Sequence, residues 1–179
     1  PDLTRHTRFA RLAVVVGDLH LVPGCHLPDG ARSLRPVLGR HGRDGGAGEF
    51  LSARTRSIQA AGVKDGDHVA AVLVCRDDDD LVLAHDHGLV TRFPAEEVRA
   101  MGRTAAGVAG MNVPTNASIV SATAVPRGED AGVEIVTVGA DGEAKRTPAD
   151  EYAAKGRGAK GVQAGPDRLA FCGVAADLH

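Results

Sequence analysis

The sequence predicts an all-β fold assembled from repeated antiparallel sheets, and three observations predict it. A stretch of 24 residues, 85–108, occurs again at 139–162 without a gap and with eleven identical positions. The apolar runs are short and are separated by Gly, Asp and Pro, which is typical of strands joined by tight turns. The composition is 43% hydrophobic but only 3% aromatic, with 23 glycines, so the core must consist mainly of small aliphatic side chains.

The two copies, offset by 54 residues, carry the same succession of local signals. Each has an apolar run, a glycine turn (His87-Gly88 or Asp141-Gly142), a second short strand and a proline (Pro94 or Pro148). Glycine reaches the positive φ that a two-residue hairpin requires, and proline lacks the N–H that continues a sheet. A period of this size indicates a repeated small sheet, whose apolar face is buried by stacking against its neighbours.

Other apolar runs extend this pattern on both sides of the hairpins. The segments 77–80 and 127–132 are expected to be hairpin tips, and the first holds four consecutive aspartates. Residues 24–50, with arginines among glycines, indicate a flexible basic loop. The expected strands outside the second arm of each hairpin are 12–16, 68–74, 81–84, 117–125, 135–138 and 167–172.

Cysteine usage and hydropathy favour a protein of the reducing cytosol. The three cysteines, Cys25, Cys75 and Cys172, are widely spaced and odd in number, which argues against a disulfide framework and favours small buried residues. No apolar run approaches the length of about 18 residues that a membrane span needs, and no basic-then-apolar leader is present. Since the chain starts at Pro1 and has only internal methionines, we expect it to be a piece of a longer protein.

Two groups of residues could in principle bind a metal ion. His85 lies near His87, and His20 lies near Cys25 and His26. Neither group has a third and fourth ligand at a standard spacing, so we expect structural roles, with no metal and no cofactor. No Ser/His/Asp order, phosphate loop or carboxylate pair indicates a catalytic site.

The order of these signals resembles the blade of the C-terminal domain found in the A subunits of DNA gyrase and of topoisomerase IV. The resemblance rests on the paired apolar strands, the glycine hairpin, the Lys/Thr-Arg-x-Pro that follows, and Gly-Arg-x-x-x-Gly-Val at 102–108 and 156–162. It covers residues 62–175 and implies a β-pinwheel of about three four-stranded blades, forming an incomplete arc in which neighbours exchange strands. The implied division is a degenerate first blade with a basic Gly-rich loop (1–61), a second blade (62–112), a third blade (113–165), and the opening strand of a further blade or the closing strand of the first (166–179).

One motif separates the two branches of this family. The gyrase A subunit carries a box of the form Gln-Arg-Arg-Gly-Gly-Lys-Gly, which is associated with chiral wrapping of DNA. The nearest match here, residues 155–161, keeps one Arg, one Lys and two Gly and differs at the other three positions. The chain therefore resembles a topoisomerase IV subunit or a divergent gyrase more than a standard wrapping domain.

The resemblance implies an accessory domain that binds and bends duplex DNA and presents it to the catalytic core of a type IIA topoisomerase A subunit. The parent enzyme would be an ATP-dependent isomerase in the bacterial cytoplasm at the nucleoid, and its further partner would be the ATPase B subunit. Catalysis in this family uses a tyrosine of the core. The only tyrosine here, Tyr152, aligns with Val98 of the other copy, so we expect a packing residue and no DNA cleavage by this chain alone.

Seven basic residues are the candidate DNA contacts, because clustered cations gain affinity through release of counterions. Two of them, Arg103 and Arg157, could instead satisfy loop carbonyls or pair with Glu97 and Glu151. The net charge of −2 favours the alternative of a propeller-type protein-interaction module that does not bind DNA. We expect Arg92, Lys145 and Arg146 to project from the outer hairpins. The full set is Arg92, Arg103, Lys145, Arg146, Lys155, Arg157 and Lys160.

Overall fold

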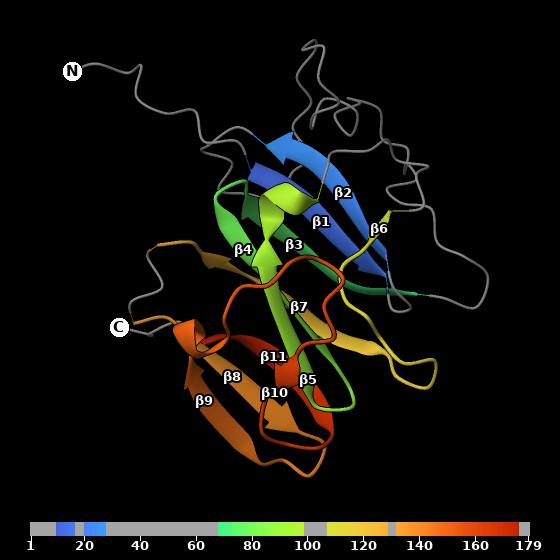
Figure 1. Cartoon of the computed structure of the whole chain (residues 1–179), viewed down its shortest axis with the longest axis vertical. Helices are drawn as coiled ribbons and strands as arrows, with labels where there is room; N and C mark the ends of the chain where they lie inside the picture. Colours follow the sequence, from blue (N-terminus) through green and yellow to red (C-terminus); the bar gives the residue numbers. More distant parts are fainter. Residues whose placement is uncertain (1–9, 17–19, 28–67, 99–106, 129–131, 176–179) are drawn as a thin grey trace, which may run out of the picture.

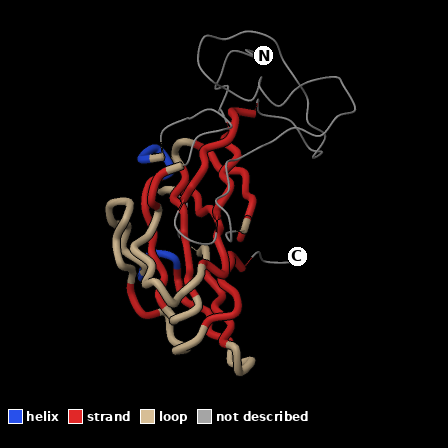
Figure 2. The backbone as a smooth tube through the Cα atoms, turned by 90° about the vertical axis from the view of Figure 1, so that its right-hand side faces the viewer, coloured by secondary structure: helices blue, strands red, loops and turns tan. Residues whose placement is uncertain are grey.

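The computed structural model describes residues 10–16, 20–27, 68–98, 107–128 and 132–175, with side chains from residue 68 onward apart from Val74. Strands make up most of these residues, together with two 3-10 helices of one turn each (Figure 2). The expected all-β fold is confirmed. Most of the region expected to be a first blade lies outside the described residues, including residues 28–50 of the expected basic loop, whereas residues 24–27 belong to strand β2 (His20–Leu27) and not to a loop.

Within the described ranges, eleven strands form three antiparallel sheets, which follow one another along the longest axis from the blue strands to the orange and red ones (Figure 1). Sheet A has the order β3-β1-β2-β6, sheet B the order β10-β5-β4-β7 and sheet C the order β11-β8-β9. The strands are β1 (Ala10–Val16), β2 (His20–Leu27), β3 (Val69–Arg76), β4 (Asp79–His85), β5 (Leu89–Pro94), β6 (Val108–Ala109), β7 (Ile119–Pro126), β8 (Glu134–Gly139), β9 (Ala144–Pro148), β10 (Val162–Gln163) and β11 (Leu169–Ala175).

The sequence repeat is also a structural repeat. The hairpin β4–β5, the 3-10 helix η2 (Ala95–Glu97) and β6 recur as β8–β9, η3 (Ala149–Glu151) and β10. The hairpin glycines have nearly the same positive φ, 80° at Gly88 and 88° at Gly142. In both copies the proline ends the second strand and leads into the 3-10 helix. The expected hairpin and proline stop are therefore both present twice, each followed by one turn of 3-10 helix.

Each sheet combines strands from neighbouring repeats. β10 follows the hairpin of sheet C but pairs with β5 of sheet B, and β6 in the same way pairs with β2 of sheet A. β7 pairs with β4 of sheet B and β11 pairs with β8 of sheet C. This is the exchange of strands that the resemblance implied. The sheets therefore do not coincide with the segments 62–112 and 113–165, because strands of one segment pair with strands of the other. In the last segment, 166–179, strand β11 pairs with β8 and so belongs to sheet C.

Sheet B is the centre of the molecule and is covered on both faces. Leu81 and Leu83 of β4 belong to the hydrophobic cluster between sheets A and B, while Val82 and Ala84 belong to the cluster between sheets B and C. All seven residues of β4 are buried, as expected for a strand with neighbours on both sides. In β8, burial alternates from residue to residue, which shows that sheet C is covered on one face.

The expected hairpin tip at 77–80 is shorter than predicted. Only Asp77 and Asp78 form the turn, and Asp79 and Asp80 already belong to β4. The Asp79 carboxylate accepts a hydrogen bond of 2.6 Å from the backbone N–H of Arg76, and burial raises its pKa above the usual value. The prediction of a four-residue tip is therefore wrong, because Asp79 and Asp80 have hydrogen-bonding partners within the sheet.

Gly161, at the end of the second copy, is in a position that a larger residue cannot occupy without strain. Its φ is +93°, and an added Cβ would lie 2.7 Å from the backbone oxygen of Val90 and 2.8 Å from Cε of Met111. We predict that Gly161→Ala lowers the free energy of unfolding by about 2 to 3 kcal/mol, measured by urea titration. Gly158 is the matched control because its φ is +84° but nothing lies within 4 Å of an added Cβ. Gly158→Ala should cost only about 1 kcal/mol, and equal losses at the two positions would contradict this account.

The burial of His85, at the end of β4, leads us to predict that the stability of the fold depends on pH. Its side chain is fully buried, Nδ1 accepts a hydrogen bond of 3.1 Å from the backbone N–H of His87, and Nε2 has no partner among the described residues. Burial lowers the pKa of His85 in the folded state, with nearby Asp86 opposing and His87 adding to the shift. Because the unfolded chain then binds the proton more readily, stability should fall as pH drops through and below about 6.5.

His85→Gln keeps an acceptor for the His87 N–H but does not titrate. Its unfolding midpoint should change less between pH 7 and pH 5 than that of the parent chain. Identical pH profiles for the two proteins would show that His85 does not carry the effect.

Candidate nucleic-acid interface

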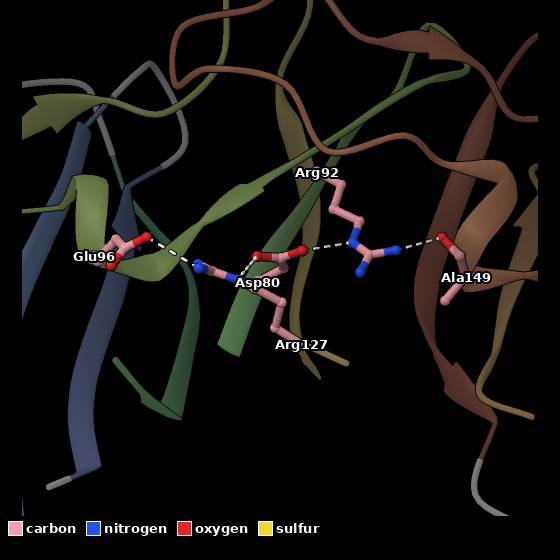
Figure 3. A network of polar contacts seen from close by, with 5 residues as sticks. All are labelled: Asp80, Arg92, Glu96, Arg127 and Ala149. Atoms are coloured by element: carbon pink, nitrogen blue, oxygen red, sulfur yellow. Dashed lines mark hydrogen bonds and ion pairs between the residues drawn. The ribbon is translucent and has the colours of Figure 1, made fainter. Parts of the chain in front are cut away.

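Arg92 lies on β5 and takes part in a buried polar network rather than reaching solvent. Its Nε atom is 2.8 Å from Oδ2 of Asp80 on the adjacent β4, and its Nη1 donates a hydrogen bond of 2.7 Å to the carbonyl oxygen of Ala149 in η3 (Figure 3). The side chain is 6% exposed. The expectation that Arg92 projects outward is therefore wrong. The physical reason is that sheet C covers this face of the hairpin, so the guanidinium connects sheets B and C.

Arg127 extends this network to the surface. Its Nε atom is 3.0 Å from Oδ1 of Asp80, and its Nη1 is 2.9 Å from Oε1 of Glu96 (Figure 3). The hydrogen bond with Glu96 raises the pKa of Arg127 above its usual value, with Asp80 adding to the shift. Asp80 thus lies between two guanidinium groups, which compensates for the burial of its carboxylate. The sequence contained a signal for this arrangement, because Asp80 and Arg92 recur 54 residues later as Glu134 and Arg146.

Arg146 and Lys145 lie on β9, the edge strand of sheet C. Arg146 is 59% exposed and forms an ion pair with Glu134 of the adjacent β8. Lys145 is exposed, and its Cδ atom is 3.2 Å from the position of a Cβ built on Gly165. Both side chains project outward, as predicted for this hairpin. The carboxylate beside Arg146 partly neutralises it, whereas Lys145 forms no ion pair with another described residue.

The segment 155–161 is a loop whose two ends lie beside β5 at the edge of sheet B and whose middle forms backbone hydrogen bonds with Gly110 and Asn112. The backbone N–H of Lys155 donates to the carbonyl oxygen of Arg92 at 2.8 Å, and a few residues later β10 pairs with the start of β5. Lys155 and Lys160 are exposed on this segment. Together with Lys145 they form what we call the lysine edge, which follows corresponding edges of sheets B and C.

Arg157 lies on the same segment but has bonding partners within the fold. Its Nη1 donates a hydrogen bond of 2.6 Å to the carbonyl oxygen of Ala109, and its backbone N–H donates to Oε2 of Glu97 at 2.7 Å. Arg157 therefore donates to a backbone carbonyl, as in one of the alternatives considered, although this carbonyl belongs to strand β6 and not to a loop. Arg103, its equivalent in the first copy, lies outside the described residues.

The tyrosine and two of the cysteines considered in the sequence are buried. Tyr152 and Val98 occupy equivalent positions after the two 3-10 helices and are 4% and 3% exposed, so Tyr152 is a packing residue, as predicted. Cys75 and Cys172 are buried, and burial raises the pKa of Cys172 to about 12. The described part of the chain contains no group of three His, Cys, Asp or Glu side chains placed to hold a metal ion. It also contains no helix with the length and apolar character needed to cross a bilayer.

Solved structures confirm the fold. The C-terminal domain of DNA topoisomerase IV superposes with a TM-score of 0.73 and 20% identity, over 99% of this chain and 49% of that one. The C-terminal domain of E. coli ParC superposes with a TM-score of 0.60 and 17% identity, over 93% of this chain and 79% of that one. At these identities the similarity concerns the arrangement of the sheets.

Sequence relatives carry the assignment further. The DNA gyrase A subunit of Salmonella typhimurium is 42% identical over 114 residues, which are 64% of this chain and 12% of that protein. The gyrase A subunit of Mycobacterium tuberculosis is 36% identical over 116 residues, or 64% of this chain and 13% of that one. The chain thus spans about an eighth of the length of these relatives. A family model described as the DNA gyrase C-terminal domain, beta-propeller, matches residues 47–76, 79–126 and 134–169, more than half of the chain. The chain therefore belongs to the family of DNA gyrase C-terminal domains.

Proposed function

We propose that this chain binds and bends duplex DNA as an accessory domain of a type IIA topoisomerase A subunit, of the topoisomerase IV type or a divergent gyrase. The observation that carries the proposal is the lysine edge, where Lys145, Lys155 and Lys160 are exposed on consecutive sheets. Cations spaced along one edge can contact successive phosphates and release their counterions. Such contacts position DNA without reading its bases, so the energy of deforming the duplex would set any sequence preference.

The relatives support a proposal about the larger assembly. Because the matched proteins are DNA gyrase A subunits of which this chain covers a small part, we propose that it acts within such a protein. It would present DNA to the catalytic core of an ATP-dependent isomerase of the bacterial cytoplasm and nucleoid, whose further partner is the ATPase B subunit. The domain would need no cofactor of its own. The burial of Tyr152 supports the proposal that this chain does not cleave DNA by itself.

The proposed binding is tested by a mobility-shift titration on duplexes longer than one helical turn, repeated at several salt concentrations. The net charge of −2 leads us to expect binding at low salt that weakens steeply as salt is added. The logarithm of the binding constant should fall linearly with the logarithm of salt concentration, by about 0.9 per phosphate contact. A chain that gives no shift at low salt would not be a DNA-binding domain.

A protein-interaction role is the second candidate, and one observation favours it. Phe171 on β11 is 50% exposed, and a large exposed apolar group is typical of protein interfaces when others lie beside it. The two roles use different surfaces, since Phe171 lies on the face of sheet C and the lysines lie along sheet edges. A variant with the lysines replaced should lose DNA binding and keep any protein contact.

A further inference from the structure

The loop that carries Lys155 and Lys160 has little side-chain packing to fix its conformation. It contains Gly156 and Gly158, and nothing lies within 4 Å of a Cβ built on either of them. Glycine has more backbone freedom than any other residue, so ordering it costs the most entropy. The conformation of this part of the loop therefore depends on the hydrogen bonds that its backbone forms with the rest of the fold.

The middle of the loop is hydrogen-bonded to residues of the preceding segment, 62–112. Several of these bonds use the backbone of residues 109–112. One uses a side chain instead, because Oε2 of Glu97 accepts a hydrogen bond of 2.7 Å from the backbone N–H of Arg157. Arg157 lies between the two glycines, where the chain has the most freedom to lose. A carboxylate is also a stronger acceptor than a neutral oxygen, so Glu97 is well placed to hold the loop.

Glu97 is at the same time a negative charge beside a surface that carries cations. Charge alone would make it unfavourable for DNA binding, because like charges repel and phosphates are negative. Its equivalent in the second copy is Glu151, which is exposed in η3 and has no hydrogen bond or ion pair with another residue that the structure describes. The repeat thus provides two exposed acids at one position, of which Glu97 is bonded to the lysine-bearing loop.

We propose that Glu97 is a positioning residue for DNA binding, whose carboxylate fixes the loop 155–161 so that Lys155 and Lys160 keep their places on the lysine edge. The proposal rests on the proposed DNA binding by that edge. The guanidinium of Arg157, which donates to the carbonyl oxygen of Ala109, fixes the loop at a second point. Because the loop is ordered before DNA arrives, binding does not have to supply the cost of ordering it.

The test measures the affinity of the whole chain for a labelled duplex, by fluorescence anisotropy at several salt concentrations, with three substitutions compared. Glu97→Ala removes both the charge and the acceptor. Glu97→Gln removes the charge but keeps a side-chain oxygen that can accept the N–H of Arg157. Since both variants lose any repulsion between Glu97 and DNA, the difference between them isolates positioning. Glu151→Ala is the matched control, because it removes an exposed acid at the same repeat position.

Glu97→Ala should bind DNA about three- to tenfold more weakly than Glu97→Gln, which is the change in loop population that one hydrogen bond typically produces. Glu97→Gln and Glu151→Ala should bind at least as tightly as the parent chain. The slope of the logarithm of the binding constant against the logarithm of salt concentration should be shallower for Glu97→Ala, by up to about two phosphate contacts. A loss of overall stability would not change this slope.

Equal affinities of Glu97→Ala and Glu97→Gln, with a parent chain that binds DNA, would overturn this proposal and leave the proposed function intact. A parent chain that does not bind at low salt would overturn both. Urea unfolding separates positioning from folding, because Glu97→Ala and Glu97→Gln should have the same midpoint. A clearly lower midpoint for Glu97→Ala would show that Glu97 stabilises the whole fold, and would overturn a role confined to the loop.

Discussion

Replacing Arg92 with alanine should destabilise the fold by about 3 to 5 kcal/mol, the usual loss when one partner of a buried ion pair is removed. The substitution removes the 2.8 Å contact with Asp80 and the 2.7 Å hydrogen bond to Ala149, which joins sheets B and C. Asp80 would retain Arg127, whose side chain is 39% exposed. The free energy of unfolding, measured in urea, reports the loss directly.

Arg146→Ala is the matched control because Arg146 has the same position in the repeat and the same kind of acidic partner. Its side chain is 59% exposed, and exposed ion pairs contribute only about 0 to 1 kcal/mol. Similar losses for the two variants would show that burial by sheet C is not what makes Arg92 important.

Replacing Lys145, Lys155 and Lys160 together with alanine should weaken binding to duplex DNA by about a hundredfold or more at about 0.1 M salt. Each phosphate contact contributes about 0.9 to the slope of the logarithm of the binding constant against the logarithm of salt concentration. At that salt concentration, losing one contact therefore lowers the affinity roughly tenfold. The slope of the logarithm of the binding constant against the logarithm of salt concentration should also become shallower, by the amount expected for the loss of up to about three phosphate contacts. Fluorescence anisotropy of a labelled duplex measures both quantities.

The control for this variant replaces the same three lysines with arginine. It keeps the charge and should therefore keep most of the affinity and the same salt slope. If the alanine variant binds as tightly as the parent chain, the lysine edge is not the DNA contact.

The repeat at an offset of 54 residues predicted the hairpins, the proline stops and the burial of Tyr152, because each depends on residues close together in the sequence. The packing of Arg92 was not predicted. Arg92 and Arg146 are the same residue in the two copies, yet one is buried and the other exposed. The difference arises from what lies on the far side of each sheet, which local sequence does not report.

The aspartates at 77–80 were misassigned for a related reason. Four adjacent acids are typical of an exposed turn, but Asp80 finds Arg92 and Arg127, which are 12 and 47 residues away in sequence. Matching Asp80 with Glu134, and Arg92 with Arg146, would have indicated a repeated acid–arginine pair. The lysines of the edge could be found from the sequence because exposed cations need no partner within the fold.

Bending of DNA is measured most directly by energy transfer between dyes at the two ends of a duplex several helical turns long. If the sheets hold phosphates along one curved edge, saturating amounts of the chain should bring the ends together and raise the transfer. The variant lacking the three lysines should not do so at the same concentration. Saturated binding by the parent chain with no change in transfer would contradict the proposal that this domain bends DNA.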